Sequence, residues 1–75
     1  MHSLDTLHPG ERAIIRSIHG ETAEEAHLME MGLLVGTLIE FIKRAPLGDP
    51  IELRVRGYHL SIRCSQAKLI KVEKA

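Results

Sequence analysis

The feature that most constrains the fold is a turn rich in proline and glycine, followed directly by strict alternation of apolar and polar residues. The turn covers residues 45–50 and the alternation covers residues 51–56. Alternation with a period of two is typical of a strand that buries one face. Gly57 interrupts the pattern, and a second alternating run follows over residues 58–64. Two such runs joined by a tight turn predict a β-hairpin, and therefore a small antiparallel β domain.

Size and composition limit the chain to one small domain, residues 1–75. A chain this short buries only about 60% of its unfolded surface and has little stability to spare. Cys64 is the only cysteine, which excludes a disulfide framework and fits a reducing cytosol. The N-terminus lacks a basic segment followed by an apolar run, and no stretch reaches the roughly 20 apolar residues that cross a bilayer. We therefore expect a cytoplasmic protein that does not insert into a membrane.

The charge balance argues against nucleic-acid binding. Ten basic and ten acidic residues give a formal net charge of zero, whereas non-specific binding to a phosphate backbone needs an excess of lysine and arginine on one face. Arg54, Arg56 and Arg63 are candidates for a shared sheet face, but Glu52 lies among them. One tyrosine and one phenylalanine also provide few stacking platforms for bases. We therefore expect no nucleic-acid partner.

Three further strands are expected outside the hairpin. They cover residues 11–19, 37–44 and 69–73. The alternation in the first of them is imperfect, so we expect a bulge near Arg16 and Ser17. Residues 65–68 are expected to form a short turn, or a single 3₁₀ turn, before the last strand.

Residues 21–31 predict the one helix of the chain. Thr22 and Glu25 have the spacing of a capping box at its start, and Gly32 is suited to end it in a left-handed conformation. The helix has two apolar edges, and a short surface helix normally buries one. We expect Leu28 and Met31 to face the core, which leaves Met29 exposed.

Five short strands and one helix in so small a chain favour a closed or nearly closed barrel. Closure removes exposed strand edges, which a small β protein must otherwise protect. We expect the core to contain the inward-facing residues of the strands: Ile39, Phe41, Ile51, Leu53, Val55, Leu60, Ile62 and Val72.

The order of these segments resembles the FeoA family of small cytoplasmic proteins and domains linked to bacterial ferrous iron uptake. The matching segments are residues 7–11, 28–33, 36–37, 45–50, 56–58, 60–63, Ala67 and 70–72. The resemblance covers nearly the whole chain, and the Ala-Pro-Leu-Gly-Asp-Pro loop in register with Gly32 and the Arg56-Gly57 turn is its most specific part.

This resemblance implies a mainly β fold, an SH3-like β-barrel of about five strands with one short helix between the first two. It also implies a non-enzymatic accessory role, exerted on the cytosolic G-protein domain of a FeoB-type membrane iron transporter. A related barrel follows a DNA-binding domain in some iron-dependent repressors, so the alternative is a metal-responsive regulatory module. At His27 the family often has arginine, and a partner contact made by that arginine would be weaker or pH-dependent here.

No catalytic or metal-binding motif stands out. The segment 32–37 lacks the lysine that a phosphate-binding loop requires, so we expect no GTP binding by this chain and no enzyme activity. The five histidines and Cys64 lack the short spacings of a local metal site, and we expect neither a bound metal nor a cofactor. Cys64 is expected to be a small core residue on the inward face of the second hairpin strand, opposite in direction to His59. Turn chemistry accounts for Asp49.

The remaining candidate for function is an apolar surface. Six apolar residues do not all fit inside so small a barrel: Met29, Leu33, Leu34, Leu38, Ile42 and Leu47. If they gather in one exposed patch, they mark a protein partner or self-association into a homo-oligomer. The other interpretation is that Leu33, Leu34 and Leu47 cover the ends of the barrel.

Overall fold

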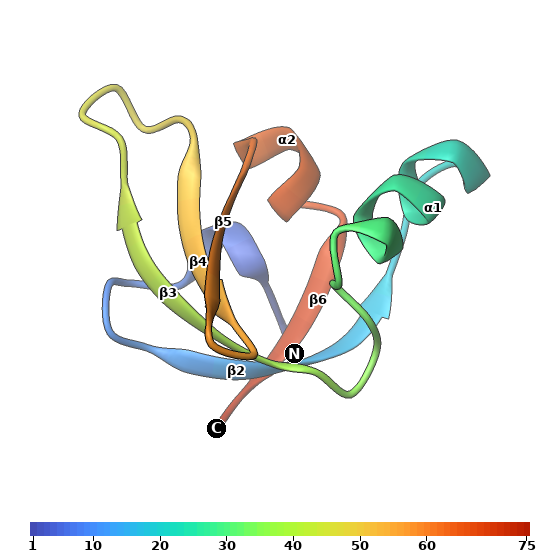
Figure 1. Ribbon diagram of the computed structural model, residues 1–75, viewed down its shortest axis with the longest axis horizontal. Coiled ribbons are helices and arrows are strands. Elements are labelled where there is room, and N and C mark those ends of the chain that lie inside the picture. The colour runs from blue at the N-terminus through green and yellow to red at the C-terminus, as the bar shows by residue number, and fades with distance from the viewer.

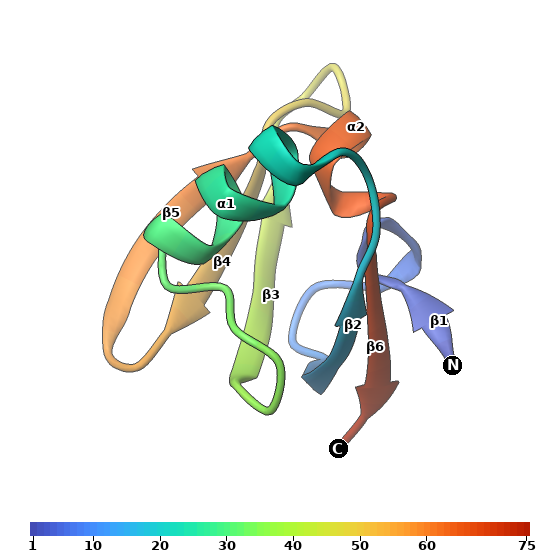
Figure 2. The same ribbon diagram turned by 90° about the vertical axis from the view of Figure 1, so that its right-hand side faces the viewer.

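In the computed structural model, which describes residues 1–75, the alternating segments form a single antiparallel sheet. The elements are β1 (His2–Ser3), the 3₁₀ turn η1 (Leu4–Thr6), β2 (Arg12–Ile18), α1 (Thr22–Glu30), β3 (Leu38–Arg44), β4 (Ile51–Val55), β5 (Tyr58–Ile62), α2 (Cys64–Ala67) and β6 (Ile70–Lys74). The strand order is β1-β6-β2-β3-β4-β5. Figures 1 and 2 show the sheet curling strongly, with α1, α2 and the 45–50 loop at one end and both termini at the other.

The predicted hairpin is confirmed. Val55 pairs with Tyr58, so the connection is the two residues Arg56 and Gly57. Both have positive φ angles, of 51° and 85°, as the tight hairpin turn that matches strand twist requires. Inward residues of β4 are fully buried and Arg54 between them is exposed, which is the expected consequence of the period-two pattern.

The core is close to the predicted one. Seven of the eight expected residues are buried, and Leu60 is only partly buried because β5 is an edge strand of the curled sheet. Leu28 is buried, Met31 packs partly against the core, and Met29 is 51% exposed. Leu4 and Leu7 from the N-terminal segment complete the core, since both are fully buried.

The structure corrects the number of strands and the capping of α1. A sixth strand, β1, is formed by two residues that pair with β6, too short a segment for an alternating pattern. The helix begins one residue later than predicted, and the carboxylate of Glu24 accepts the backbone N–H of Glu21 at 3.3 Å. The cap therefore uses Glu21 and Glu24 in place of Thr22 and Glu25. The bulge is confirmed, because the β2–β6 register shifts between Ile15 and Ser17.

Cys64 packs partly against the core, as predicted, but its predicted strand position and the predicted local turn at Asp49 were wrong. Cys64 is the first residue of the short helix α2 and is partly buried, so it does not lie on a strand opposite His59. The carboxylate of Asp49 accepts the backbone N–H of Cys64 at 2.9 Å, and the Cys64 thiol donates to the carbonyl oxygen of Gly48 at 3.0 Å. These long-range bonds end the alternation and join the 45–50 loop to α2.

Candidate interaction surfaces

The six apolar residues considered for one surface differ in their burial and do not lie together. Leu33 is fully buried, Leu34 and Ile42 are partly buried, and Met29, Leu38 and Leu47 are 51%, 46% and 98% exposed. Leu38 and Leu47 lie at opposite ends of β3, whose seven residues separate them by about 20 Å at the rise of a strand. Figure 1 shows the 45–50 loop far from the start of β3. The single contiguous patch is therefore not present.

Leu33 is buried because of how α1 ends. Gly32 adopts a φ of 95°, and the chain reverses so that the Leu33 N–H bonds to the carbonyl oxygen of Leu28 at 3.1 Å. The Gly32 N–H bonds to the carbonyl oxygen of Met29 at 2.9 Å. This pair of bonds is the Schellman motif, in which the residue after the glycine packs against the third-last helical residue. Leu33 and Leu28 are accordingly both in the core.

Leu38 belongs to an outward-facing group of residues on β2, β3, β4 and the turn after β4, which we call the arginine face. It consists of Arg12, Leu38, Glu40, Arg54 and Arg56, which line a shallow hollow of about 140 Å³. The Arg54 guanidinium pairs with the Glu40 carboxylate at 2.6 Å. Arg12 and Arg56 have no carboxylate within ion-pair distance. The Arg56 guanidinium donates to the Thr37 hydroxyl at 3.3 Å. The face thus combines a half-exposed leucine with two guanidinium groups that have no carboxylate partner.

Cross-strand register assembles this face. Arg12 on β2 is opposite Glu40 on β3, and Glu40 is opposite Arg54 on β4. Local alternation predicts Arg54 and Arg56 as neighbours but does not include Arg12, because register between distant strands is not visible in it. Arg63, which was predicted to share this face, lies at the start of α2.

Leu47 stands at the tip of a braced loop. The Gly48 N–H bonds to the carbonyl oxygen of Ala45 at 2.7 Å, and the Ala45 N–H bonds to that of Pro50 at 3.0 Å. Together with the two bonds to Cys64 described above, these contacts hold the loop in one conformation. The Leu47 side chain is 98% exposed at its tip.

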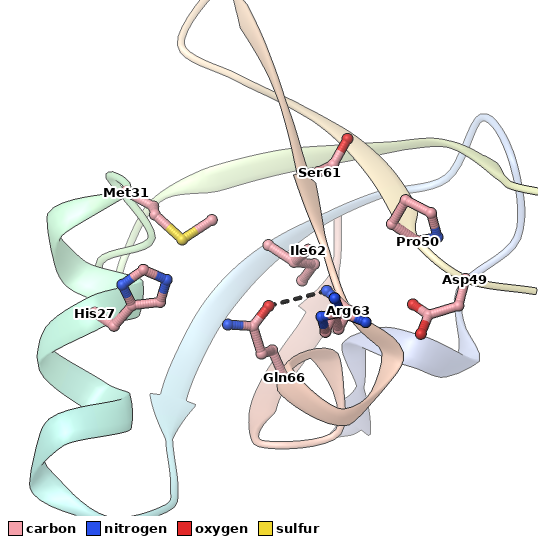
Figure 3. Close-up of a pocket in the computed structure, with 8 residues that line it drawn as sticks. All are labelled: His27, Met31, Asp49, Pro50, Ser61, Ile62, Arg63 and Gln66. Carbon is pink, nitrogen blue, oxygen red and sulfur yellow. Dashed lines mark hydrogen bonds between the residues drawn. The ribbon is translucent and has the colours of Figure 1, made fainter.

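A larger cavity, of about 390 Å³, lies between α1, the end of β5, α2 and the 45–50 loop. Figure 3 shows His27 and Met31 reaching into it from α1, with Arg63 and Gln66 on the opposite side. The side-chain oxygen of Gln66 accepts the backbone N–H of Arg63 at 2.9 Å. None of the residues lining this cavity lines the arginine face.

Neither surface contains a metal centre or a catalytic constellation. No group of three or more histidine, cysteine, aspartate and glutamate side chains is arranged to hold a metal ion. The His8 backbone N–H, at 2.7 Å, and the Lys74 ammonium, at 3.0 Å, lower the pKa of the Glu11 carboxyl below its usual value, away from both surfaces. None of the helices has the length and apolar character needed to span a membrane.

We expect no tight metal site in the isolated chain. Isothermal titration with Zn²⁺, or with Fe²⁺ under anaerobic conditions, at neutral pH should show no stoichiometric site tighter than roughly 10 μM, which corresponds to about −7 kcal/mol. A tighter site that disappears when His59 or Cys64 is replaced would contradict this and would favour a metal-responsive module.

Comparison with known proteins finds relatives in the FeoA family, in agreement with the resemblance seen in the sequence. The model of the FeoA domain matches residues 2–74. A fusion of Fe(2+) transport protein A with the Fe(2+) transporter FeoB from Porphyromonas gingivalis is 36% identical over 70 residues. That match covers 93% of this chain and only 8% of the fusion protein, so the chain spans a small part of its relative's length.

Solved structures of similar chains have the same fold. A FeoA-like protein from Clostridium acetobutylicum is 40% identical, with a TM-score of 0.89 and coverage of 96% of this chain and 84% of the other. The zinc-bound FeoA of Stenotrophomonas maltophilia, described as an SH3 domain protein and candidate ferrous iron transport activating factor, is 25% identical. Its TM-score is 0.81, over 97% of this chain and 91% of the other. The fold is thus SH3-like, as predicted.

The same fold occurs within metal-dependent repressors. A manganese-dependent transcriptional repressor superposes with a TM-score of 0.92 over 99% of this chain and 36% of the repressor, at 13% identity. At that identity the likeness concerns the fold alone.

Proposed function

This chain belongs to the FeoA domain family, and from that premise we propose that it is a non-enzymatic accessory protein of bacterial ferrous iron uptake. In this proposal it acts in the cytoplasm by binding the cytosolic G-protein domain of a FeoB-type transporter. The observation that carries the proposal is the Porphyromonas gingivalis fusion, in which a relative of this chain is joined covalently to the transporter. A covalent linkage holds two partners at a high effective concentration, which is useful when the two act together. We infer that the separate proteins also associate.

The arginine face is the surface that we propose for this docking. Arginine is enriched at protein interfaces, and apolar side chains at their centres supply binding energy on desolvation. Leu38 provides the apolar centre, 46% exposed, and Arg12 and Arg56 beside it provide guanidinium groups that have no carboxylate partner. A partner surface with an apolar centre and surrounding carboxylates would complement it.

Leu38→Glu tests this surface. We expect it to weaken binding to the transporter's cytosolic region by about tenfold or more, since a central contact is worth roughly 2 kcal/mol and a charge opposes a dry interface. The thermal unfolding temperature should change little because the side chain is half exposed. Co-precipitation and sedimentation, each paired with a thermal melt, measure binding, self-association and folding.

Leu47→Glu is the matched control, since it makes the same substitution at an exposed leucine beyond the far end of β3. It should leave binding intact. Loss of binding in Leu47→Glu, with Leu38→Glu unaffected, would place the interface on the 45–50 loop instead. Met29→Glu extends the test to α1, where another exposed apolar side chain lies.

A regulatory module that senses metal directly is the alternative function. The SH3-like fold is compatible with it, but the fusion with a transporter favours the accessory role. The metal titration described above separates the two.

A further inference from the structure

We propose that the cavity between α1, the end of β5 and α2 binds an acidic side chain on a peptide segment of a protein partner. This second site is independent of the docking proposed above, because its lining residues are distinct from the arginine face. It also does not require that the partner be the transporter.

The cavity presents hydrogen-bond donors in excess of acceptors. The Arg63 guanidinium lines it, with no carboxylate within ion-pair distance. The Gln66 carbonyl oxygen is occupied by the Arg63 backbone N–H, so the amide NH₂ group is the part that remains for a ligand. Figure 3 shows this amide lying between Arg63 and the ring of His27, which carries at least one N–H.

Asp49 is the one acidic residue at the cavity, and one of its carboxylate oxygens accepts the Cys64 N–H at 2.9 Å. The donors left for a ligand are the Arg63 guanidinium, the Gln66 amide and the N–H of the His27 ring. The forked guanidinium is suited to a planar, two-oxygen acceptor. Charge-assisted bonds from guanidinium to carboxylate are the strongest of the side-chain hydrogen bonds.

The walls of the cavity favour a peptide over a free anion. Met31, Pro50 and Ile62 contribute apolar surface beside the donors, and a free inorganic anion has nothing to place against them. The volume of about 390 Å³ is within the range of sites that hold small organic ligands. A glutamate with an aliphatic neighbour satisfies both the donors and the apolar wall.

The test uses two blocked tripeptides that differ only in charge, acetyl-Leu-Glu-Leu-amide and acetyl-Leu-Gln-Leu-amide. Amide chemical shifts of Arg63, Gln66 and their neighbours report binding to the full chain in two-dimensional NMR titrations. We expect the glutamate peptide to bind about tenfold or more tightly, because hydrogen bonds to a charged group are stronger than those to a neutral amide. Equal affinities for the two peptides would overturn the proposal.

Two substitutions locate the site. Arg63→Gln removes the guanidinium, and Gln66→Glu keeps an oxygen for the Arg63 N–H while replacing the free amide by a repelling carboxylate. Both should abolish the preference for the glutamate peptide and leave the thermal melt nearly unchanged. Arg12→Gln, on the arginine face, is the matched control and should retain the preference. Retention by Arg63→Gln and Gln66→Glu would overturn the assignment of the site.

Titration with inorganic phosphate tests whether the ligand is a free anion or an acidic peptide. We expect it to bind at least about tenfold more weakly than the glutamate peptide, since it lacks the apolar contacts. Phosphate binding at the same residues with equal or greater affinity would replace a peptide with a free anion as the ligand and would overturn the proposal.

Discussion

Replacing Phe41 by alanine should lower the free energy of unfolding by about 3–5 kcal/mol, the range for removing a buried aromatic ring. Phe41 is fully buried at the centre of β3 and is the largest buried side chain of the molecule. The Arg44 guanidinium lies 5.2 Å from its ring centroid and also donates to the carbonyl oxygen of Asp5. Loss of the ring therefore leaves a cavity and also removes a contact of the residue that ties β3 to the N-terminal segment.

Denaturant melts measure this loss. Since a domain has only about 5–15 kcal/mol of stability in total, much of the Phe41→Ala protein should be unfolded at moderate temperature. Phe41→Leu is the control, because it keeps most of the volume and should cost less. A loss below about 1 kcal/mol in Phe41→Ala would show that the ring is not part of the core.

Gly32→Ala should be the second most damaging change. The φ of 95° at Gly32 is one that other residues rarely adopt, at a cost of about 1–2 kcal/mol. An added Cβ would also lie 2.2 Å from the Tyr58 hydroxyl, which donates to the Met31 carbonyl oxygen at 2.7 Å. Moving that hydroxyl breaks its hydrogen bond, which adds about 0.5–1.5 kcal/mol.

Gly36→Ala is the matched control for the cost of placing alanine at a positive φ angle. Gly36 has a φ of 91° and no atom within 4 Å of an added Cβ, so it should lose only the conformational part. The difference between the free energies of unfolding of the two variants, measured in urea, gives the cost of the contact with Tyr58. Equal losses would show that this contact does not constrain the end of α1. In the Gly32→Ala background, Tyr58→Phe should recover part of the steric cost, because it removes the clashing oxygen.

Local patterns predicted the strands well because burial on one face imposes a period of two wherever a strand occurs. The run of Ile51, Leu53 and Val55 is fully buried as predicted. The same pattern continues through Cys64, yet the strand ends at Ile62. The bonds that stop it come from Gly48 and Asp49, far away in sequence, and no local periodicity contains them.

The candidate surface was harder to predict for a similar reason. Leu33 was assigned to it, although a leucine directly after a helix-ending glycine is the signal of a Schellman contact with the core. Arg12 was missed because its neighbours Glu40 and Arg54 are set by the register of three strands. The cavity of Arg63 and Gln66 draws its residues from four separate segments, which only the folded chain brings together.

Calorimetric titration with the purified cytosolic G-protein domain of a FeoB-type transporter measures the proposed binding. We expect saturable binding with a dissociation constant in the micromolar range or tighter, about −8 kcal/mol. The same titration with Leu38→Glu should show the loss predicted for the arginine face. Absence of saturable binding by the unmodified chain up to about 1 mM, equivalent to about −4 kcal/mol, would show that the chain does not act by docking on this domain.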